Sequence, residues 1–398
     1  MRLLRVIHSL AAAGGGPAES VRQFSAALTQ LGVTTEVASL DDRTQTVRID
    51  GVERIWCLGP GRGSYGFSRR LDTWLDEHVR RFDGVVIQGL WNYPSLATWR
   101  ALQRWRRQGA KVPPYWVYPH GMLDPWFKRA HPLKHLKKAV YWRLAEHRVL
   151  RDAEAVLFTA DEERLRARQS FSPYQCREAV VPHGIHAPPT AGADLSETFL
   201  QARPELRGKR LLLYLGRLHP KKGPELAIEG FCRALQQHPE AERTAWTLVM
   251  AGPASGTGVD EGYLRRLQAH ATGQAVVFPG LLQGELKWGA FHACEAFLLP
   301  SHQENFGIAV VEALACGKPV LISDQVNIWR EIEAAGAAFV APDTLEGTES
   351  LLQRWMSLPD AERAAMSQNA RQCFEARFEI RRAAERFLEV VRRVTTDH

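Results

Sequence analysis

Two carboxylates in the segment 300–319 flank the start of an apolar helix. Glu304 lies in a loop after an apolar strand end, and Glu312 lies within the helix, which Gly317 ends. Because this helix is apolar on nearly every face, we expect it to be buried, and a buried carboxylate is costly unless its oxygens accept hydrogen bonds. Sugar hydroxyls, as on a ribose, would supply those bonds. Two alternatives stay open: Glu304 as a surface acid, and Glu312 as an internal partner of Arg217.

The same loop offers backbone donors. The N–H groups near Phe306 and Gly307 stand at the beginning of the helix, where the first N–H groups lack partners within it. Such groups point at any negative charge placed before the helix. The loop therefore predicts contact with an anionic or hydroxyl-rich ligand.

A second loop carries fixed positive charge. A buried strand at 211–215 is followed by Gly216, which allows a sharp turn, and then by Arg217 and Lys222. A planar guanidinium and an ammonium group at the carboxyl end of a strand suit a diphosphate. The alternative is an ordinary basic surface loop.

The first half of the chain has two weaker candidates. Gly15 and Gly16 belong to a run of three glycines after the first strand, with Pro17 suited to a first helical turn. This loop would let a ligand approach the backbone, although a merely flexible turn explains it as well. His120 follows a strand at 115–118 and reaches the same predicted sheet edge, although a lone histidine is often structural.

Short apolar runs alternate with longer helical patterns through the whole chain, which predicts two doubly wound parallel α/β domains. The predicted strands lie at 3–7, 35–39, 85–88, 115–118, 155–159, 179–181, 211–215, 247–251, 276–278, 296–299 and 319–322. We predict a first domain at 1–187, a linker at 188–208, a second domain at 209–377 and a terminal helix at 378–398 that could return to the first domain. The carboxyl ends of both sheets would then face one cleft.

Composition limits the class of protein. A chain of 398 residues that is 45% hydrophobic and 24% charged is typical of a folded protein with two domains. Arg and Lys interrupt every apolar run, so no membrane span is predicted, and the apolar start reads as a strand rather than a signal peptide. Six scattered cysteines suggest reduced thiols and a cytoplasmic location. The net charge of +7 comes without a basic, aromatic stripe, so nucleic acid is not an expected partner.

We predict no metal site and no cofactor. The six cysteines form no C-x-x-C pair. His131 and His135 are spaced like metal ligands on a helix, but Lys134, Lys137 and Lys138 surround them and would repel a cation.

Together these motifs resemble glycosyltransferase family 4, the retaining enzymes of GT-B fold. The resemblance rests on the segment 300–319 with its two glutamates, on Gly216-Arg217 and Lys222-Gly223, on Pro119-His120-Gly121, and on the segment 181–185. It covers essentially the whole chain. Where many relatives have Asn, this chain has His183, which leaves the role of that side chain open. The element 120–126 resembles bacterial members that build surface polysaccharides.

The resemblance implies a role for each candidate. Arg217 and Lys222 would hold the diphosphate of a nucleotide-sugar donor, a UDP- or GDP-sugar, and stabilise the leaving group. Glu312 would bind the ribose and Glu304 the donor sugar, while backbone at Asn305, Phe306 and Gly307 would touch sugar and phosphate. His120 and the glycines Gly15 and Gly16 would approach the reacting centre from the other domain. The family transfers a hexose with retention and without metal, and the chain has no Asp-x-Asp triplet.

Other functions remain to be weighed. A module of the same fold that binds nucleotide sugars without reacting would keep both domains, but it would usually lose a charged site residue, and none is missing here. A nicotinamide oxidoreductase would share the architecture, but it requires G-x-G-x-x-G after a strand, which neither domain offers. An enzyme acting on a glycan or lipid-linked acceptor is the preferred interpretation.

The segment 128–144 suggests where such an enzyme works. Leu133, Leu136, Val140 and Leu144 form an apolar stripe at helical spacing, and Tyr141 with Trp142 would suit a membrane interface. The basic cluster around this stripe comprises Lys128, Arg129, Lys134, Lys137 and Lys138. We predict peripheral contact with an anionic membrane through this cluster. The alternative is a packed helix with a solvated basic face.

Overall fold

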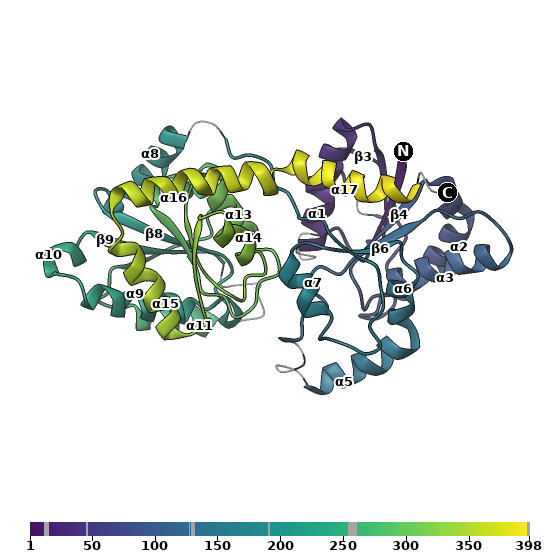
Figure 1. Ribbon diagram of the computed structural model, residues 1–398, viewed down its shortest axis with the longest axis horizontal. Coiled ribbons are helices and arrows are strands. Elements are labelled where there is room, and N and C mark those ends of the chain that lie inside the picture. Colours follow the sequence, from purple (N-terminus) through teal and green to yellow (C-terminus); the bar gives the residue numbers. More distant parts are fainter. Residues whose placement is uncertain are drawn as a thin grey trace. The chain divides into compact units, whose positions relative to one another are not determined.

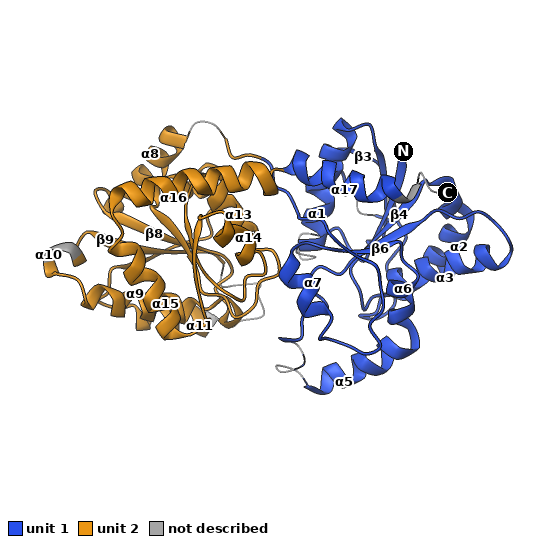
Figure 2. Cartoon of the chain, in the orientation of Figure 1, with its two compact units in different colours: residues 1–186, 380–398 blue, residues 187–379 orange. Residues whose placement is uncertain are grey.

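The chain folds into two compact units, described by a computed structural model for residues 1–11, 16–44, 47–126, 128, 132–189, 192–253 and 261–395. The first unit comprises residues 1–186 and 380–398, and the second comprises residues 187–379 (Figure 2). The chain therefore passes from the first unit to the second and then back again.

The first unit is built on a parallel sheet of seven strands in the order β3-β2-β1-β4-β5-β6-β7. The strands are β1 (Arg2–Ile7), β2 (Thr34–Ser39), β3 (Val52–Cys57), β4 (Gly84–Gln88), β5 (Tyr115–Tyr118), β6 (Ala155–Phe158) and β7 (Glu178–Val180). The strand order reverses between β1 and β4, which places a switch point at the centre of the sheet. Loops that follow β1, β4 and β5 meet at this switch point.

Helices cover both faces of this sheet. One face carries α1 (Gly16–Gln30) and α17 (Ile380–Thr395), which lie side by side although they are far apart in sequence (Figure 1). The other face packs against α2 (Arg69–His78), α3 (Tyr93–Arg107) and α6 (His147–Arg151). The remaining helical segments are η2 (Val79–Arg81), α5 (Pro132–Tyr141), η3 (Trp142–Glu146) and α7 (Asp161–Ala167).

The second unit has a parallel sheet of six strands in the order β10-β9-β8-β11-β12-β13. The strands are β8 (Arg210–Leu215), β9 (Trp246–Ala251), β10 (Val276–Gly280), β11 (Ala296–Leu299), β12 (Val320–Ser323) and β13 (Ala338–Ala341). The helices are α8 (Gly192–Ala202), α9 (Pro224–Gln236), α10 (Glu240–Arg243), α11 (Glu261–His270), α12 (Gly284–Ala293), α13 (Ile308–Ala315), α14 (Trp329–Ala334), α15 (Leu345–Met356) and α16 (Asp360–Cys373), with η4 (Pro204–Leu206), η5 (Pro220–Lys222) and η6 (Phe374–Phe378). Strands β8 and β11 are neighbours at the switch point, so the two charged loops that follow them share one sheet edge.

The segment predicted as a linker, 188–208, carries a packed helix instead. On α8, Leu195 and Phe199 are four residues apart and both are buried. Gly289 of α12 lies so close that a β-carbon there would stand 2.2 Å from the Leu195 carbonyl oxygen. The linker prediction rested on the Pro and small residues at 186–193, and it overlooked this apolar pair.

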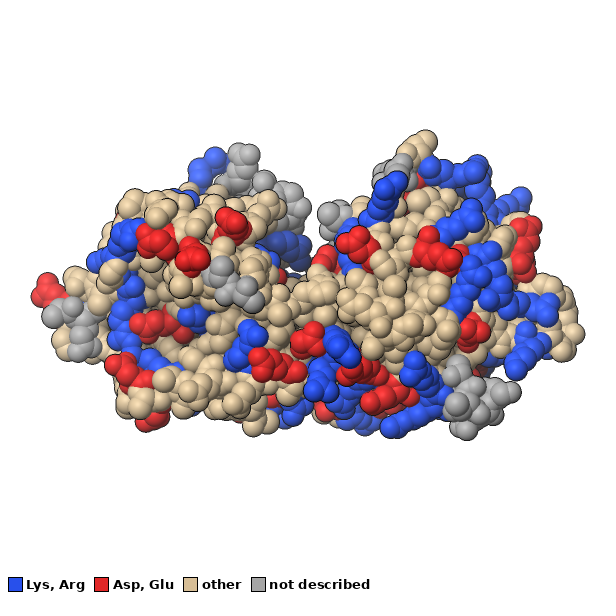
Figure 3. Space-filling view, turned by 90° about the horizontal axis from the view of Figure 1, so that it is seen from above, with Lys and Arg blue, Asp and Glu red and all other residues tan. Residues whose placement is uncertain are grey.

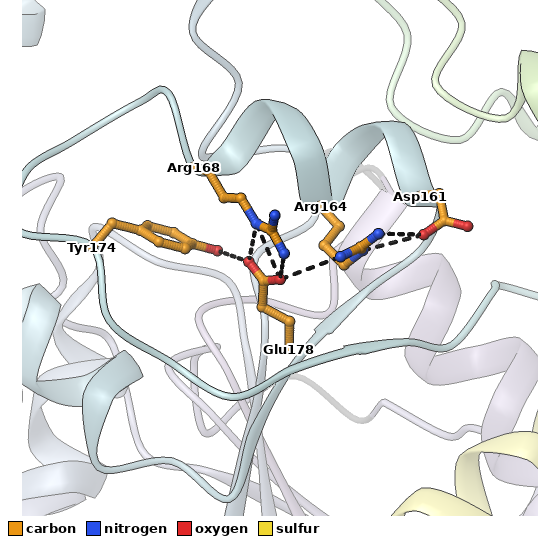
Figure 4. A network of polar contacts seen from close by, with 5 residues as sticks. All are labelled: Asp161, Arg164, Arg168, Tyr174 and Glu178. Atoms are coloured by element: carbon orange, nitrogen blue, oxygen red, sulfur yellow. Dashed lines mark hydrogen bonds and ion pairs between the residues drawn. The ribbon is translucent and has the colours of Figure 1, made fainter.

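At the far edge of the first sheet, a polar network ties α7 to β7 (Figure 4). Glu178 accepts hydrogen bonds from Arg168 Nε at 3.0 Å and from the Tyr174 hydroxyl at 3.0 Å, and Arg164 joins Glu178 to Asp161. On the face drawn in Figure 3, Lys and Arg side chains likewise alternate with Asp and Glu. None of the described helices is long and apolar enough to cross a membrane.

Candidate functional site

The loop after β8 is fixed by contacts with Tyr214 and with the loop after β11. The buried hydroxyl of Tyr214 donates to the Arg217 carbonyl at 3.3 Å, which supports the loop from beneath. Gly223 has a φ of +64°, and a β-carbon there would stand 2.2 Å from the Pro300 carbonyl oxygen. This glycine is therefore required where the loops after β8 and β11 approach each other. The Arg217 side chain itself is exposed.

Lys222 and Glu304 form an ion pair between these two loops. Lys222 Nζ donates to Glu304 Oε2, and the two side chains are only 13% and 21% exposed. Burial by itself raises the pKa of Glu304, but Lys222 more than offsets this, so the pKa lies below its ordinary value. The sequence predicted both residues as separate ligand contacts. The structure brings them together, and it gives Glu304 a partner rather than the open surface of the alternative interpretation.

The backbone around Glu304 is fixed on both sides. Its N–H donates to the Gln325 carbonyl at 3.0 Å, and its carbonyl accepts from Asn327 N at 3.0 Å. Its Oε1 atom accepts from the backbone N–H of Asn305 at 3.1 Å. Gly307, with a φ of +74°, then begins α13, whose first N–H groups lack acceptors within the helix. Phe306 is buried below this turn.

Glu312 pairs with a residue that sequence reasoning missed. Lys287 Nζ on α12 donates to Glu312 Oε1 at 2.7 Å, and the glutamate side chain is 13% exposed. Arg217, the internal partner that the sequence suggested as an alternative, is not the residue in this ion pair. Nothing in the sequence around Lys287 distinguishes it from other lysines, because its approach to Glu312 depends on how α12 and α13 are placed.

In the first unit, His120 lies at the switch-point edge in a strained backbone conformation, with a φ of +50°. A residue other than glycine in this region costs on the order of 1–3 kcal/mol. Its ring is already engaged: Nε2 lies 2.8 Å from Gln88 Oε1 and Nδ1 lies 3.2 Å from His183 Nε2. The next residue, Gly121, donates its N–H to buried Glu163 at 2.6 Å.

The glycine loop is only partly described. Gly15 lies outside the described residues, while Gly16 begins α1, and a β-carbon on Gly16 would meet no described atom within 4 Å. Gly16 is thus not required by packing. The candidate donor residues Gly216, Arg217, Lys222, Glu304, Asn305, Phe306, Gly307 and Glu312 all belong to the second unit, and His120 and Gly16 belong to the first.

The apolar stripe on and after α5 is exposed, but two of the residues predicted near it point inward. The four stripe residues are exposed, at 83% for Leu133, 65% for Leu136, 56% for Val140 and 68% for Leu144, so the alternative of a packed helix is wrong. Figure 1 shows α5 at the periphery of its unit. Lys128, Lys134 and Lys137 are exposed as well, and Arg129 lies outside the described residues.

Two predicted members of this surface point inward instead. Lys138 Nζ lies 4.6 Å from the centre of the Trp91 ring, and burial lowers its pKa. Trp142 is buried and donates its indole N–H to the Pro173 carbonyl at 2.7 Å. Helical spacing predicted that both residues lie near the stripe. It could not show that their side chains point towards the rest of the first unit.

No group of three or more His, Cys, Asp or Glu side chains among the described residues is placed to hold a metal ion. His131, one of the two histidines with metal-ligand spacing, lies outside the described residues. All six cysteines are free thiols.

Two family models match the chain, one in each unit. Residues 15–184 match a glycosyl transferase 4-like domain, and residues 196–373 match the glycosyl transferases group 1. Curated relatives include D-inositol 3-phosphate glycosyltransferases from Corynebacterium jeikeium, 27% identical over half of each chain, and from Kineococcus radiotolerans, 25% identical over 64% of this chain and 60% of the relative. The chain spans between 25% and 60% of the length of the curated relatives it matches.

Solved structures match over essentially the whole chain. A complex of Anabaena Alr3699/HepE with UDP and glucose has a TM-score of 0.72 at 18% identity, covering 99% of this chain and 100% of that one. Sucrose-phosphate synthase from Thermosynechococcus elongatus has a TM-score of 0.72 at 19% identity, covering 100% of both chains. At these identities the likeness shows the fold, and the fold predicted from the sequence, two parallel α/β domains of GT-B type, is confirmed.

Proposed function

We propose that the chain, whose first unit matches a glycosyl transferase 4-like domain and whose second unit matches the glycosyl transferases group 1, transfers a hexose from a nucleotide-sugar donor to a glycan or lipid-linked acceptor, with retention of configuration. The observation that carries this proposal is the ion pair of Lys222 and Glu304, held between loops that follow neighbouring strands. A little-exposed cation at this sheet edge is suited to a diphosphate.

The pair is arranged for exchange with a donor. When a diphosphate enters, Lys222 can transfer its hydrogen bonds from the carboxylate to phosphate oxygens, and the exposed Arg217 can add a planar fork. Glu304 is then free to accept hydrogen bonds from hydroxyls of the donor sugar. Glu312, which is paired with Lys287, would bind the ribose hydroxyls in the same way. The helix α13 begins between the two glutamates and offers N–H groups to a phosphate.

The proposed reaction proceeds on one face of the sugar. The acceptor oxygen forms its bond to the anomeric carbon on the side from which the diphosphate leaves, and the acceptor proton passes to a phosphate oxygen of the leaving group. Arg217 and Lys222 stabilise the negative charge that develops there, so we propose that the reaction needs no metal.

Hydrolysis of a panel of UDP- and GDP-sugars, without acceptor, tests the donor assignment. We expect slow release of nucleoside diphosphate from one donor, and its loss in Lys222→Met. Lys209→Met is the matched control. Lys209 lies just before β8 begins, whereas Lys222 lies in the loop after β8 ends, and in the described chain Lys209 Nζ contacts only the Thr244 carbonyl. Tight donor binding without hydrolysis or transfer would favour the non-catalytic module instead.

We further propose that the enzyme works in bacterial polysaccharide biosynthesis, docked on the inner face of the plasma membrane through α5. The four exposed aliphatic side chains support this, since an unburied apolar helix face fits the acyl boundary of a bilayer. Lys134 and Lys137 would each add ~1 kcal/mol against an anionic leaflet. A lipid-linked acceptor would be met at this surface.

Sedimentation with vesicles tests the docking. We expect binding to vesicles that contain anionic lipid, reduced by Lys134→Glu with Lys137→Glu, and abolished by Leu133→Gln with Leu136→Gln. Lys209→Glu in the second unit is the control for net charge. Equal binding to neutral and anionic vesicles would contradict the charge contribution, and binding by the leucine variant would contradict the surface.

A further inference from the structure

One arginine in the centre of the first sheet has no evident partner. Arg5 of β1 is fully buried, and none of its three side-chain nitrogens has a hydrogen-bond partner within the described part of the chain. Its guanidinium instead lies 5.5 Å from the ring centre of Phe24 on α1 and 5.9 Å from that of Phe387 on α17. Burial lowers its pKa to about 10, so it is still a cation at neutral pH. A buried charge without a carboxylate is costly, and this cost calls for a function.

Towards the carboxyl edge of the sheet from Arg5, four side chains form a hydrogen-bond chain. Ser20 Oγ lies 3.3 Å from His183 Nδ1, His183 Nε2 lies 3.2 Å from His120 Nδ1, and His120 Nε2 lies 2.8 Å from Gln88 Oε1. The amide oxygen of Gln88 can only accept, so His120 carries its hydrogen on Nε2. His120 Nδ1 then accepts from His183 Nε2–H, and His183 Nδ1 accepts from the Ser20 hydroxyl.

Neighbouring rings fix the planes of both imidazoles. The His120 and His183 ring centres lie 5.1 Å apart at an angle of 21°, and the centre of each ring lies 5.5 Å from that of Tyr118. A ring held by two neighbours and two hydrogen bonds has one orientation.

Electrostatics keep the two rings neutral. Burial, then His183, then Arg5 lower the pKa of His120 well below its ordinary value. Burial and Arg5 lower the pKa of His183 to about 3. Two further ionisable groups of the described chain lie beside the pair: Tyr118, whose pKa burial raises, and Glu163, whose oxygens accept from Gly121 N and Thr159.

We propose that His183 is a positioning residue, which holds His120 as a single tautomer with its hydrogen on Nε2, and that burial together with the charge of Arg5, which contacts the same Phe24 ring as His183, keeps the pair neutral. This rests on the proposed function only for its catalytic consequence. In the described chain this Nε2–H donates to Gln88 Oε1, so a sugar hydroxyl would receive it by taking the place of that oxygen, and a neutral ring would not act as a counter-ion for phosphate. This gives a role to His183, which stands where many relatives have Asn. Its imidazole links Ser20 to His120, because one ring nitrogen accepts a hydrogen bond from Ser20 and the other donates one to His120.

Side-chain ¹⁵N–¹H spectra of the full chain without substrate test the tautomer. We expect one Nε2–H form of His120 from pH 5.5 to 8, a mixture of tautomers in His183→Leu, and partial retention in His183→Asn. His78→Asn is the control, because the contacts of His78 Nδ1 with the Trp74 carbonyl and with Glu77 Oε2 both lie within α2 and its ring takes no part in the hydrogen-bond chain of His120 and His183. A wild-type Nδ1–H form, or a His120 signal that His183→Leu leaves unchanged, would overturn the proposal.

Kinetics test the consequence separately. In His183→Leu we expect kcat for sugar transfer to fall roughly 10- to 100-fold, with the donor KM within about twofold. Arg5→Met should give kcat an acid limb at a higher pH than in wild type, because loss of the charge raises the pKa of both histidines. Unchanged histidine titration in Arg5→Met would refute the part assigned to Arg5. Absence of any transferase activity in wild type would refute the proposed function and leave the spectroscopic result standing.

Discussion

The two units handle polar groups at their sheet edges in opposite ways. In the second unit, Lys222 with Glu304 and Lys287 with Glu312 are charged pairs that stay partly open to solvent. In the first unit, His120 and His183 are neutral and hydrogen-bonded to each other. Charged pairs can exchange partners when an anion arrives, whereas a neutral chain keeps its geometry. Under the proposed function, the second unit would bind the charge of the donor and the first would orient a neutral hydrogen-bonding group.

The two arrangements also differ in their cost. An ion pair that keeps some contact with water pays a reduced desolvation penalty, and each partner compensates the other. Arg5 has neither advantage, since it is fully buried without an acceptor among the described residues. In the second unit, the desolvation cost of each charged group is thus offset by its ion-pair partner. In the first unit, the desolvation cost of Arg5 must be offset by the stability of the rest of the fold.

The largest expected effect comes from removing a charge of the second unit. Replacing Lys222 by Met should remove about 2–4 kcal/mol of transition-state stabilisation, measured as a decrease in kcat/KM. We expect a loss in the same range for Arg217→Met. Steady-state kinetics with the donor found in the hydrolysis panel would measure this. Normal turnover by either variant would break the assignment of charge binding to this unit.

Lys222→Met should also change how the free energy of unfolding depends on pH. Because the pKa of Glu304 is lowered in the fold, its pair adds stability that is present above the ordinary value of 4.5 and is lost as pH falls through the folded pKa. Urea unfolding from pH 7 to 3 should show a smaller acid loss in Lys222→Met than in wild type. Identical pH dependence would mean that Lys222 does not set this pKa.

A smaller effect of opposite sign is expected in the first unit. Arg5→Met should raise the free energy of unfolding by about 1–3 kcal/mol, because it replaces an unpaired buried cation by an apolar chain of similar length. The same variant should lose activity at acid pH, as argued above. Denaturant unfolding measures the first effect, and strong destabilisation would show that Arg5 has an acceptor after all.

The polar network of Glu178 should matter still less. Glu178→Gln weakens contacts to Arg168 and Arg164, which are 49% and 27% exposed at their side chains, so we expect Tm to fall by no more than about 3 °C. Activity should not change. A large loss of activity would show that charge in the first unit contributes to function, and it would blur the contrast between the units.

The smallest expected effect is none. Excess chelator should leave the transfer rate unchanged, because Arg217 and Lys222 stabilise the leaving diphosphate in the proposed reaction. A rate that EDTA abolishes and magnesium or manganese restores would require a different account of the second unit.

Much of the fold could be predicted because central parallel strands are buried on both faces and read as continuous apolar runs. The predicted strand at 115–118 coincides with β5, and most others agree within one or two residues. The prediction missed β3 and β13, which are both edge strands. In β3, Glu53 and Arg54 are exposed, so the apolar run is broken.

The site was predictable where a motif follows a strand and unpredictable where a partner comes from packing. Lys222 and Glu304 lie in the loops that follow neighbouring strands, β8 and β11, so their approach could be inferred from topology. Lys287, Arg5 and the inward turn of Lys138 depend on how helices pack on the sheets, which no local pattern encodes. His183 was noticed only as a departure from Asn, and its contact with His120 required coordinates.

The return of α17 to the first unit has a consequence for how the protein is made. Phe387, which covers Arg5, is synthesised after every residue of the second unit. Domains usually fold in the order in which they leave the ribosome. Here the second unit can complete its core during translation, whereas the first must wait with Arg5 and Phe24 uncovered until the last helix emerges. We therefore expect the second unit to complete its core before the first.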